Sequence, residues 1–225
     1  TVLSMEAGMK ADIMDGTGRL SASVFYYQMN DQQLTAVGGD ANFNRLINAD
    51  KTLGKGFEVD LEVAVTRDLL VTGSLSYNDT ELDDDSIAVA VCAQCTVHDP
   101  LNNDGQAILN GNRLPHAPEW IMNFTARYTK ELGEGELFVF TDWSYRSEIN
   151  FFLYESEEFT GAPLLEGGLR VGYTWDSGDN TYEVSLFSRN INDKQVAIGG
   201  IDFNNLTGMV NEGRFVGAEF KMSFF

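Results

Sequence analysis

Two cysteines, Cys92 and Cys95, are the only thiols among the 225 residues and lie three positions apart. Such a pair serves as a redox centre where a helix N-terminus lowers the pKa of one thiol, and otherwise it can close a short disulfide. A four-ligand zinc site is a third alternative, but it would also need His98 and His116, of which only His98 is close in the sequence. The spacing alone leaves the three alternatives open.

Oxygen-bearing side chains gather between Asp99 and Gly105, in the run Asp-Pro-Leu-Asn-Asn-Asp-Gly. The run resembles half of a calcium-binding loop, but the distal glutamate that would complete such a loop does not follow at the required distance. We therefore expect an Asx-rich turn there, and solvated loop segments at the acidic runs 83–85 and 155–158. The sequence contains no Ser-His-Asp, Cys-His or phosphate-cradling pattern, so we expect neither an enzyme nor a bound cofactor.

The overall charge is strongly negative, because 34 aspartates and glutamates outnumber 15 lysines and arginines, which gives a net charge of −19. Nucleic acids are bound through cationic groups that neutralise phosphates, so a nucleic-acid partner is excluded. Disorder is excluded as well, since 43% of the residues are hydrophobic and 12% are aromatic, which is too much apolar surface to leave in water.

Apolar and polar side chains alternate with a period of two along much of the chain. In the clearest stretch, residues 57–66, the sequence Phe, Val, Leu, Val, Val alternates with Glu, Asp, Glu, Ala, Thr. Successive side chains of a strand point to opposite faces, so this pattern predicts strands with one apolar and one polar face. Nine strands are expected, over residues 5–14, 20–28, 57–66, 69–77, 120–128, 137–146, 165–175, 182–189 and 214–224.

The connections between these strands alternate in length. Short turns rich in glycine, aspartate and asparagine alternate with long connections at residues 31–53, 83–119, 147–163 and 192–213, and all four prolines fall in the long ones. Tight turns at one rim and large loops at the other are typical of an up-and-down barrel. The sequence therefore predicts an all-β, antiparallel barrel architecture.

Two interpretations of the alternation compete, a soluble barrel or sandwich with an apolar interior and a membrane barrel whose apolar face meets lipid. Tryptophan and tyrosine lie mostly near the strand ends on the apolar face, and these residues concentrate at membrane interfaces. We therefore expect a transmembrane barrel in contact with lipid. Its polar face would line the lumen with charges that include Glu58, Asp60, Glu62, Asp142, Arg170 and Arg189. Ion pairs across neighbouring strands are expected, for instance between Asp142 and Arg170.

Four sequence motifs in order resemble those of the β-barrel of TonB-dependent outer-membrane receptors. They are Gly54-Lys55-Gly56-Phe57-Glu58-Val59 before a long strand, the lead-in 111–120 (Gly-Asn-Arg-Leu-Pro-His-Ala-Pro-Glu-Trp), Asp142-Trp143-Ser144-Tyr145-Arg146-Ser147 at a strand end, and Asn190-Ile191-Asn192-Asp193-Lys194. The family's usual Pro-Arg before the last strand is Gly213-Arg214 here, and the terminal aromatic of the family is doubled as Phe224 and Phe225. The resemblance implies that these two phenylalanines form the C-terminal assembly signal.

The resemblance also implies how much of a receptor residues 1–225 represent. Nine strands would be the C-terminal portion of a barrel of about 22 strands, with the plug domain, the N-terminal strands and the contact with the TonB complex supplied by the rest of the receptor. The loop that carries Cys92 and Cys95 would be extracellular and would assemble through an oxidising compartment. A disulfide between the two cysteines is then expected, and no metal site.

The expected function is TonB-dependent uptake of a scarce nutrient across the bacterial outer membrane, with a siderophore–iron chelate as the leading small-molecule ligand. A structural or adhesive barrel component is the alternative. The candidate ligand-binding residues are Tyr145 and Arg146 at a strand end with Phe151, Phe152 and Tyr154 on the loop that follows. Exposed aromatic side chains beside an arginine could grip an aromatic, anionic chelate, whereas packing between loops is the competing interpretation of the same residues.

Overall fold

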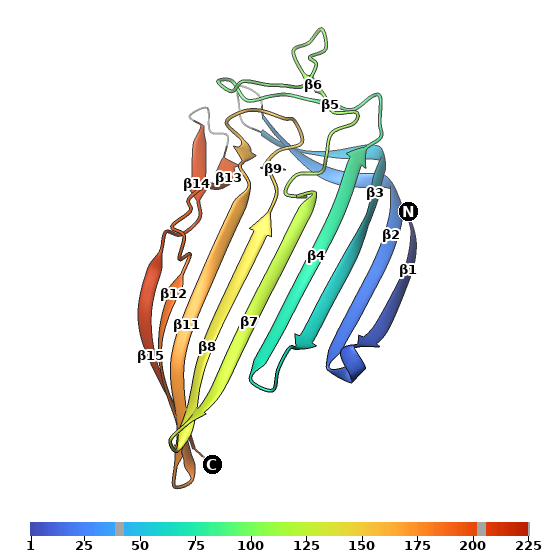
Figure 1. The fold of residues 1–225 in the computed structure, drawn as a ribbon. Coiled ribbons are helices and arrows are strands. Elements are labelled where there is room, and N and C mark those ends of the chain that lie inside the picture. Colours follow the sequence, from blue (N-terminus) through green and yellow to red (C-terminus); the bar gives the residue numbers. More distant parts are fainter. Residues whose placement is uncertain (39–42, 202–205, 225) are drawn as a thin grey trace.

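A computed structural model describes residues 1–38, 43–201 and 206–224. Nine strands form one antiparallel sheet in the order β1-β2-β3-β4-β7-β8-β11-β12-β15 (Figure 1). Their bounds are β1 Val2–Ile13, β2 Gly18–Gly38, β3 Phe43–Ala64, β4 Leu69–Leu82, β7 Trp120–Leu132, β8 Gly135–Arg146, β11 Leu164–Ser177, β12 Asn180–Arg189 and β15 Phe215–Phe224. The nine predicted strands and the all-β class are confirmed.

Smaller elements lie within the connections. A 3-10 turn, η1 (Met14–Gly16), joins β1 to β2. Three short antiparallel pairs occupy the long connections: β5 (Ala88–Val89) with β6 (Ala107–Ile108), β9 (Ile149–Asn150) with β10 (Thr160–Gly161), and β13 (Ala197–Ile201) with β14 (Thr207–Val210). Among the described residues no helix has the length and apolar character needed to cross a membrane. The long connections therefore carry local structure of their own.

The strand register separates the two faces as the alternation predicts. Val24, Phe57 and Tyr77 lie opposite one another on β2, β3 and β4. The adjacent row on the other face holds Ser23, Glu58 and Ser76. A register slip of one residue would exchange the two faces, so the apolar row and the polar row fix the register together.

Aromatic rings form two clusters on the apolar face, one towards each end of the strands. Near the long-loop end, the rings of Tyr77 and Trp120 lie 4.8 Å apart and the rings of Phe57 and Tyr77 lie 5.9 Å apart. Near the short-turn end, Trp175 stacks between Tyr173 and Tyr182 at centroid distances of 5.8 and 5.5 Å. An aliphatic band between two aromatic girdles is the outer surface of a membrane barrel.

The connection 31–53, expected as a long loop, is instead mostly strand. The ladder between β2 and β3 continues to the pair Gly38–Phe43, with an irregularity at Asp31, whose φ is 55°. In Figure 1 this hairpin bends over and crosses behind the upper end of β4. The expectation was wrong because Ala36 and Ala49, 7% and 0% exposed, alternate with polar residues and have a buried surface to pack against.

The buried hydrophobic cluster of the chain lies at the long-loop end and not within the sheet. It joins Ala36 and Ala49 of the bent hairpin to side chains of the connections 83–119 and 147–163, namely Ile87, Val89, Cys92, Ala107, Leu109, Ile149, Phe151, Leu153, Tyr154 and Phe159, with Leu82 at the end of β4. We call the two connections together with the bent hairpin the loop cap. Buried side chains of the sheet such as Phe138, 2% exposed, do not belong to this cluster, so the packed core forms where the connections meet.

Candidate ligand-binding region

The structure buries most of the aromatic residues that were expected to be exposed for ligand contact. Phe151 and Tyr154 are 5% and 1% exposed. Phe152 stacks with Tyr154 at 5.6 Å and makes an edge contact with Phe159 at 4.6 Å. Sequence reasoning placed these residues on an exposed loop, but they contact one another and the loop core. Packing between loops is what the structure shows for this segment.

Arg146 is occupied by backbone groups of the neighbouring connections. Its guanidinium donates hydrogen bonds to carbonyl oxygens, three from Nη1 and one from Nη2, at Ser147 (3.0 Å), Gly161 (3.3 Å), Ala162 (3.1 Å) and Ala197 (3.3 Å). Tyr145, half-buried, lies between Met122 and Leu165 in the strand register. Arg146 therefore ties the end of β8 to two connections in this structure, and its donors are directed to protein carbonyls.

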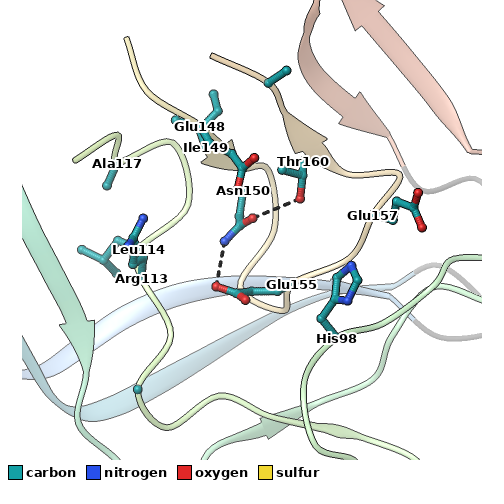
Figure 2. A pocket seen from close by; sticks show the side chains of 12 residues that line it. His98, Arg113, Leu114, Ala117, Glu148, Ile149, Asn150, Glu155, Glu157 and Thr160 are labelled. Carbon is teal, nitrogen blue, oxygen red and sulfur yellow. Dashed lines mark hydrogen bonds between the residues drawn. The ribbon is translucent and has the colours of Figure 1, made fainter. Parts of the chain in front are cut away.

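A cavity of about 700 Å³ lies between the connections 83–119 and 147–163 (Figure 2). Its polar lining includes His98, Arg113, Glu148, Asn150, Glu155, Glu157 and Thr160. Asn150 organises one wall, since its Nδ2 donates to Glu155 Oε1 at 3.1 Å and its Oδ1 accepts from Thr160 Oγ1 at 3.2 Å. Small-molecule sites commonly have volumes of roughly 300–1,000 Å³, so the cavity has room for a ligand.

Sequence reasoning missed most of this cavity. Glu155 and Glu157 were noted only as members of an acidic run, and His98 only as a possible zinc ligand. Arg113 and Ala117 lie within the lead-in motif 111–120, which offered a signal that this segment approaches the site. Asn150 carried no such signal, because its role depends on hydrogen bonds to residues that follow it by five and ten positions.

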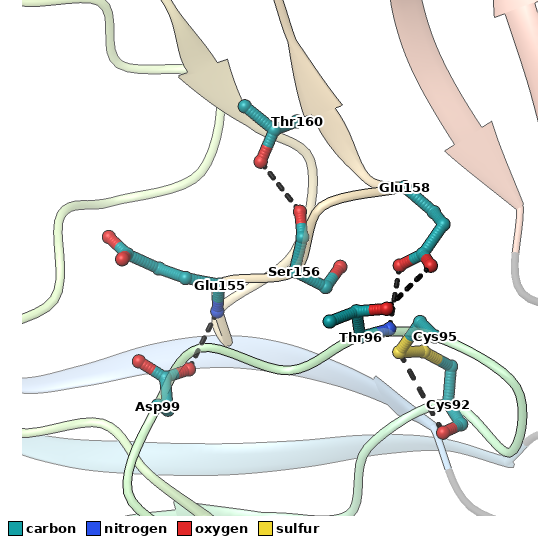
Figure 3. The surroundings of a disulfide bond; sticks show 8 residues. All are labelled: Cys92, Cys95, Thr96, Asp99, Glu155, Ser156, Glu158 and Thr160. Atoms are coloured by element: carbon teal, nitrogen blue, oxygen red, sulfur yellow. Dashed lines mark hydrogen bonds between the residues drawn. A yellow bond between two sulfur atoms is a disulfide. The ribbon is translucent and has the colours of Figure 1, made fainter.

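The two connections are clasped together beside a disulfide (Figure 3). Cys92 and Cys95 are joined by a disulfide with their Cα atoms 5.7 Å apart. The next residue, Thr96, donates its backbone N–H to Glu158 Oε2 at 2.7 Å and its hydroxyl to Oε1 at 3.0 Å. The backbone N–H of Thr96 lowers the pKa of the Glu158 carboxyl below its usual value. The ionised carboxylate is therefore the form that this contact favours, and the contact weakens as the pH falls through that lowered pKa.

Asp99 and Asn112 form the buried part of the same clasp. The carboxylate of Asp99 accepts the backbone N–H of Glu155 at 2.6 Å and the Nδ2 of Asn112 at 3.0 Å. Asn112 Nδ2 also donates to the carbonyl oxygen of Leu153 at 3.0 Å. Burial raises the pKa of Asp99, an effect that the hydrogen bond from Glu155 partly opposes. One amide group thus joins a carboxylate and a carbonyl from the two connections.

We expect Asn112→Ala to open this clasp. The substitution removes the Asn112 donor from Asp99 Oδ1 and from the Leu153 carbonyl, at a cost of about 1–3 kcal/mol, while Asp99 Oδ2 keeps the N–H of Glu155. Hydrogen exchange of the His98 and Glu155 amides in the full-length receptor should then accelerate, while the sheet amides keep their protection. Asn102→Ala is the matched control, because the hydrogen bonds of the Asn102 side chain to described residues stay within its own turn, at Asp104 and Gln106. Equal acceleration in both variants would contradict the clasp.

The residues considered as calcium or zinc ligands from the sequence make other contacts in the structure. Asn102 Oδ1 accepts the backbone N–H groups of Asp104 and Gln106 at 2.9 and 3.0 Å, so the expected Asx turn within 99–105 is confirmed. His116 stacks on Phe151 at 5.6 Å. Within residues 1–38, 43–201 and 206–224, no three histidine, cysteine, aspartate or glutamate side chains come close enough to hold a metal ion.

The charges on the polar face are paired on one side of the sheet. Arg170 contacts Glu183 at 2.9 Å and Glu219 at 3.1 Å, and Arg189 contacts Asp142 at 3.4 Å. The expected pair of Asp142 with Arg170 is therefore wrong. Gly168 lies in register with Asp142 and has no side chain. The Asp142 carboxylate lies over this glycine and reaches Arg189 on β12 instead.

The other side of the polar face is acidic. Glu58, Asp60 and Glu62 follow one another along β3 on the same face, opposite hydroxyl-bearing residues of β4. On β2 their register partners are Ser23, Ser21 and Arg19, and the Arg19 guanidinium contacts Asp12 at 3.7 Å. In the described part of the chain, no ion pair involves these three carboxylates. Asp60 and Glu62 border a second cavity of about 390 Å³. Their orientation towards a lumen stays a prediction.

Of the two C-terminal phenylalanines, the structure describes Phe224. Phe224 is 74% exposed and shares its face with Phe220 and Met222 on β15. Phe225 lies outside the described residues. The assembly role expected of the pair stays a prediction.

Comparison with known proteins gives one family and a consistent set of folds. Residues 1–162 match the family described as TonB dependent receptor-like, beta-barrel. No curated protein sequence matches significantly.

Among solved structures, the ferric yersiniabactin uptake receptor FyuA from Yersinia pestis is similar with a TM-score of 0.71 and 18% identity, covering 100% of this chain and 30% of FyuA. The siderophore receptor PiuA from Acinetobacter baumannii gives 0.68 and 17%, covering 99% of this chain and 28% of PiuA. The ferric-catecholate import receptor Fiu from E. coli gives 0.66 and 14%, covering 100% and 27%. The chain thus spans less than a third of these receptors, and at these identities the likeness concerns the fold.

Proposed function

Because the chain belongs to the TonB-dependent receptor β-barrel family, we propose that it forms the C-terminal portion of the barrel of an outer-membrane importer. TonB-dependent receptors are transporters of the bacterial outer membrane and not enzymes. In this proposal the remaining barrel strands, a plug domain and the contact with the TonB complex come from the rest of the receptor. The observation that supports it most is the sheet of nine antiparallel strands with an apolar, aromatic-girdled face.

The cargo in this proposal is a scarce nutrient in the form of a siderophore–iron chelate. The solved receptors with the same fold are named for ferric yersiniabactin uptake, for siderophores and for ferric-catecholate import. Their identity to this chain is 18% or less, so their names support the class of cargo and leave the individual chelate open. The cavity of the loop cap is large enough to hold part of such a chelate.

The loop cap has the properties of a preformed binding surface. Its two connections share a buried cluster and are clasped by Asp99, Asn112, Thr96 and Glu158. In the proposed function this cap faces the cell exterior and holds the cargo between the two connections. Tyr145, Arg146, Phe151, Phe152 and Tyr154 then act by fixing the shape of the cap, and the cavity lining makes the direct contacts.

Uptake of labelled iron tests the proposal. We expect cells whose only route for a ferric siderophore is the full-length receptor to accumulate iron in a TonB-dependent manner, because the cargo must be moved by work done on the plug. In an otherwise identical host without TonB, accumulation should fall to background while surface binding persists. Accumulation that does not change when TonB is removed would contradict active import and would favour a structural or adhesive barrel.

A further inference from the structure

We infer that the cavity of the loop cap selects net-cationic ligands, and that the cargo is therefore a ferric chelate with positively charged groups and not an anionic one. That the ligand is a transported cargo rests on the proposed function, whereas the selection for positive charge rests on the charge of the cap. It assigns Glu148, Glu155 and Glu157 as the residues that impose the selection.

The first support is the charge of the two connections that build the cavity. Connections 83–119 and 147–163 carry ten carboxylates, and Arg113 is their only lysine or arginine. Arg113 is itself paired with Glu119, its Nη2 lying 2.6 Å from the carboxylate. Clefts lined by charge of one sign focus the field and raise the local concentration of the opposite charge. Lys51 of the bent hairpin pairs with Asp83, which leaves the carboxylates around the cavity in excess. The two connections therefore attract cations and repel anions before any contact is made.

The second support is the distribution of these carboxylates around the cavity. Glu148 and Glu157 are exposed, while Glu155 is half-buried and held by Asn150. In Figure 2 Glu148 lies on one side of the space and Glu157 on another, with Glu155 between Asn150 and His98. The three acids thus line a cavity of about 700 Å³ together with His98 and Arg113, and this volume is far more than one ion occupies. Together with the lack of a three-ligand metal cluster among the described residues, this favours cationic groups distributed over a larger ligand.

The third support lies on the polar face of the sheet. Glu58, Asp60 and Glu62 form a column of carboxylates on β3 that takes part in no ion pair within the described residues. The opposite side of the same face is balanced by Arg170 and Arg189. Arg19 lies in register with Glu62 but contacts Asp12, so the three carboxylates leave this side of the face with an excess of negative charge. A cationic ligand then meets attractive surfaces at both levels.

These charges distinguish between classes of iron chelate. A ferric ion bound by three catecholates is strongly anionic, whereas one bound by three hydroxamates is neutral, and pendant amines make it cationic. Ammonium groups would donate charge-assisted hydrogen bonds to the cavity glutamates, and the neutral hydroxamate core would avoid repulsion. A hydroxamate-type chelate with free amines is the ligand class that this lining fits.

Thiol labelling in the cavity tests the selection without knowledge of the cargo. Ala162 is exposed and lines the cavity, so the full-length receptor with Ala162→Cys would be treated with a cationic and an anionic methanethiosulfonate of similar size. We expect the cationic reagent to react about tenfold faster than the anionic one, relative to their rates with free cysteine, and the ratio to fall with added salt. The receptor without the introduced cysteine gives the background.

The matched variant carries Glu148→Gln, Glu155→Gln and Glu157→Gln together with Ala162→Cys. Glutamine keeps the size of each side chain and the acceptor that Glu155 offers to Asn150, so the cavity should keep its shape. The rate ratio should then fall towards one. A ratio near one or below one with the native glutamates would overturn the inference, and so would a ratio that the three substitutions leave unchanged.

Binding of paired chelates separates this inference from the proposed function. The probes are a ferric trihydroxamate with a pendant amine, the same chelate with the amine acetylated, and a ferric triscatecholate. We expect the amine form to bind the native receptor about tenfold more tightly than the acetylated form, and the difference to vanish in the triple glutamine variant. Equal binding of all three overturns the charge selection and leaves iron import standing. If none binds while the labelling ratio holds, the iron-chelate assignment fails and the cationic selection stands.

Discussion

Replacing Phe159 by alanine is expected to destabilise the loop cap by about 3–5 kcal/mol, which is the usual cost of truncating a buried phenylalanine. Phe159 is 2% exposed. Its ring meets that of Phe152 at 4.6 Å and lies against Gly200, while its backbone carbonyl accepts the N–H of Phe151 at 2.9 Å. One side chain thus joins the connection 147–163 to the hairpin of β13 and β14. Its loss leaves a cavity that rigid neighbours cannot fill.

The loss should be confined to the cap, because the sheet shares little of its packing. Hydrogen exchange in the full-length receptor should show faster exchange across the connections 83–119 and 147–163, with protection of β7, β8 and β11 unchanged. Ligand affinity should fall as well, since Thr160 of the cavity wall follows Phe159 directly. Leu101→Ala is the control, because Leu101 lies in the same cap but is 53% exposed. A uniform loss of protection over the sheet would contradict a separately packed cap.

The strands could be predicted from the sequence because their signal is local. In β3 the alternation of Phe57, Val59 and Leu61 with Glu58 and Asp60 shows both faces within a few residues. No distant residue is needed to read such a pattern, since lipid and water act on each strand in the same way. In the bent part of the β2–β3 hairpin the alternation of apolar and polar residues is weaker. One face of this part packs on protein through small side chains such as Ala36 and Ala49, so the sequence did not indicate a strand.

Packing of the loop aromatics was one of two interpretations that the sequence allowed, but their partners could not be named, since these lie far along the chain. Phe151 contacts His116 and lies against Gly161. Its sequence neighbourhood shows only that it belongs to a long connection. Four apolar residues in a row raised the correct question of what covers them, but their partners become visible only in three dimensions. The cavity could not be predicted for the same reason, because its walls come from two connections that are separated in the sequence by the strands β7 and β8.

The sequence predicted which charged side chains share a face of the sheet, but not which of them form ion pairs. Arg170 and Asp142 were both placed correctly on the polar face, yet each pairs with another residue. In the register Arg170 lies opposite Phe140 and Phe187, so it reaches diagonally to Glu183. The sequence shows which side chains share a face, whereas the diagonal reach depends on register and on glycines such as Gly168.

The assignment of the two faces predicts a large difference between adjacent residues of β7. Phe124 lies on the apolar face midway between Trp120 and Tyr128, and is 43% exposed. Phe124→Arg should destabilise the folded barrel by about 2–4 kcal/mol, because a charged side chain facing lipid near the bilayer midplane loses its hydration. The measurement is urea unfolding of the full-length receptor in lipid vesicles, with the fraction that migrates as folded protein in an unheated gel as a second readout.

Asn123→Arg is the matched control, since it introduces the same side chain one residue away at the same depth. Asn123 lies on the polar face, where its Nδ2 donates to Ser74 Oγ at 3.2 Å, and Ser74 is in register with Asp60. An arginine here would lose one weak hydrogen bond and gain an acidic neighbour, so the folded barrel should keep nearly all of its stability. If Asn123→Arg were as damaging as Phe124→Arg, or more so, the apolar face could not be the one that meets lipid. The acidic column of β3 would then lose its place on the path of the cargo.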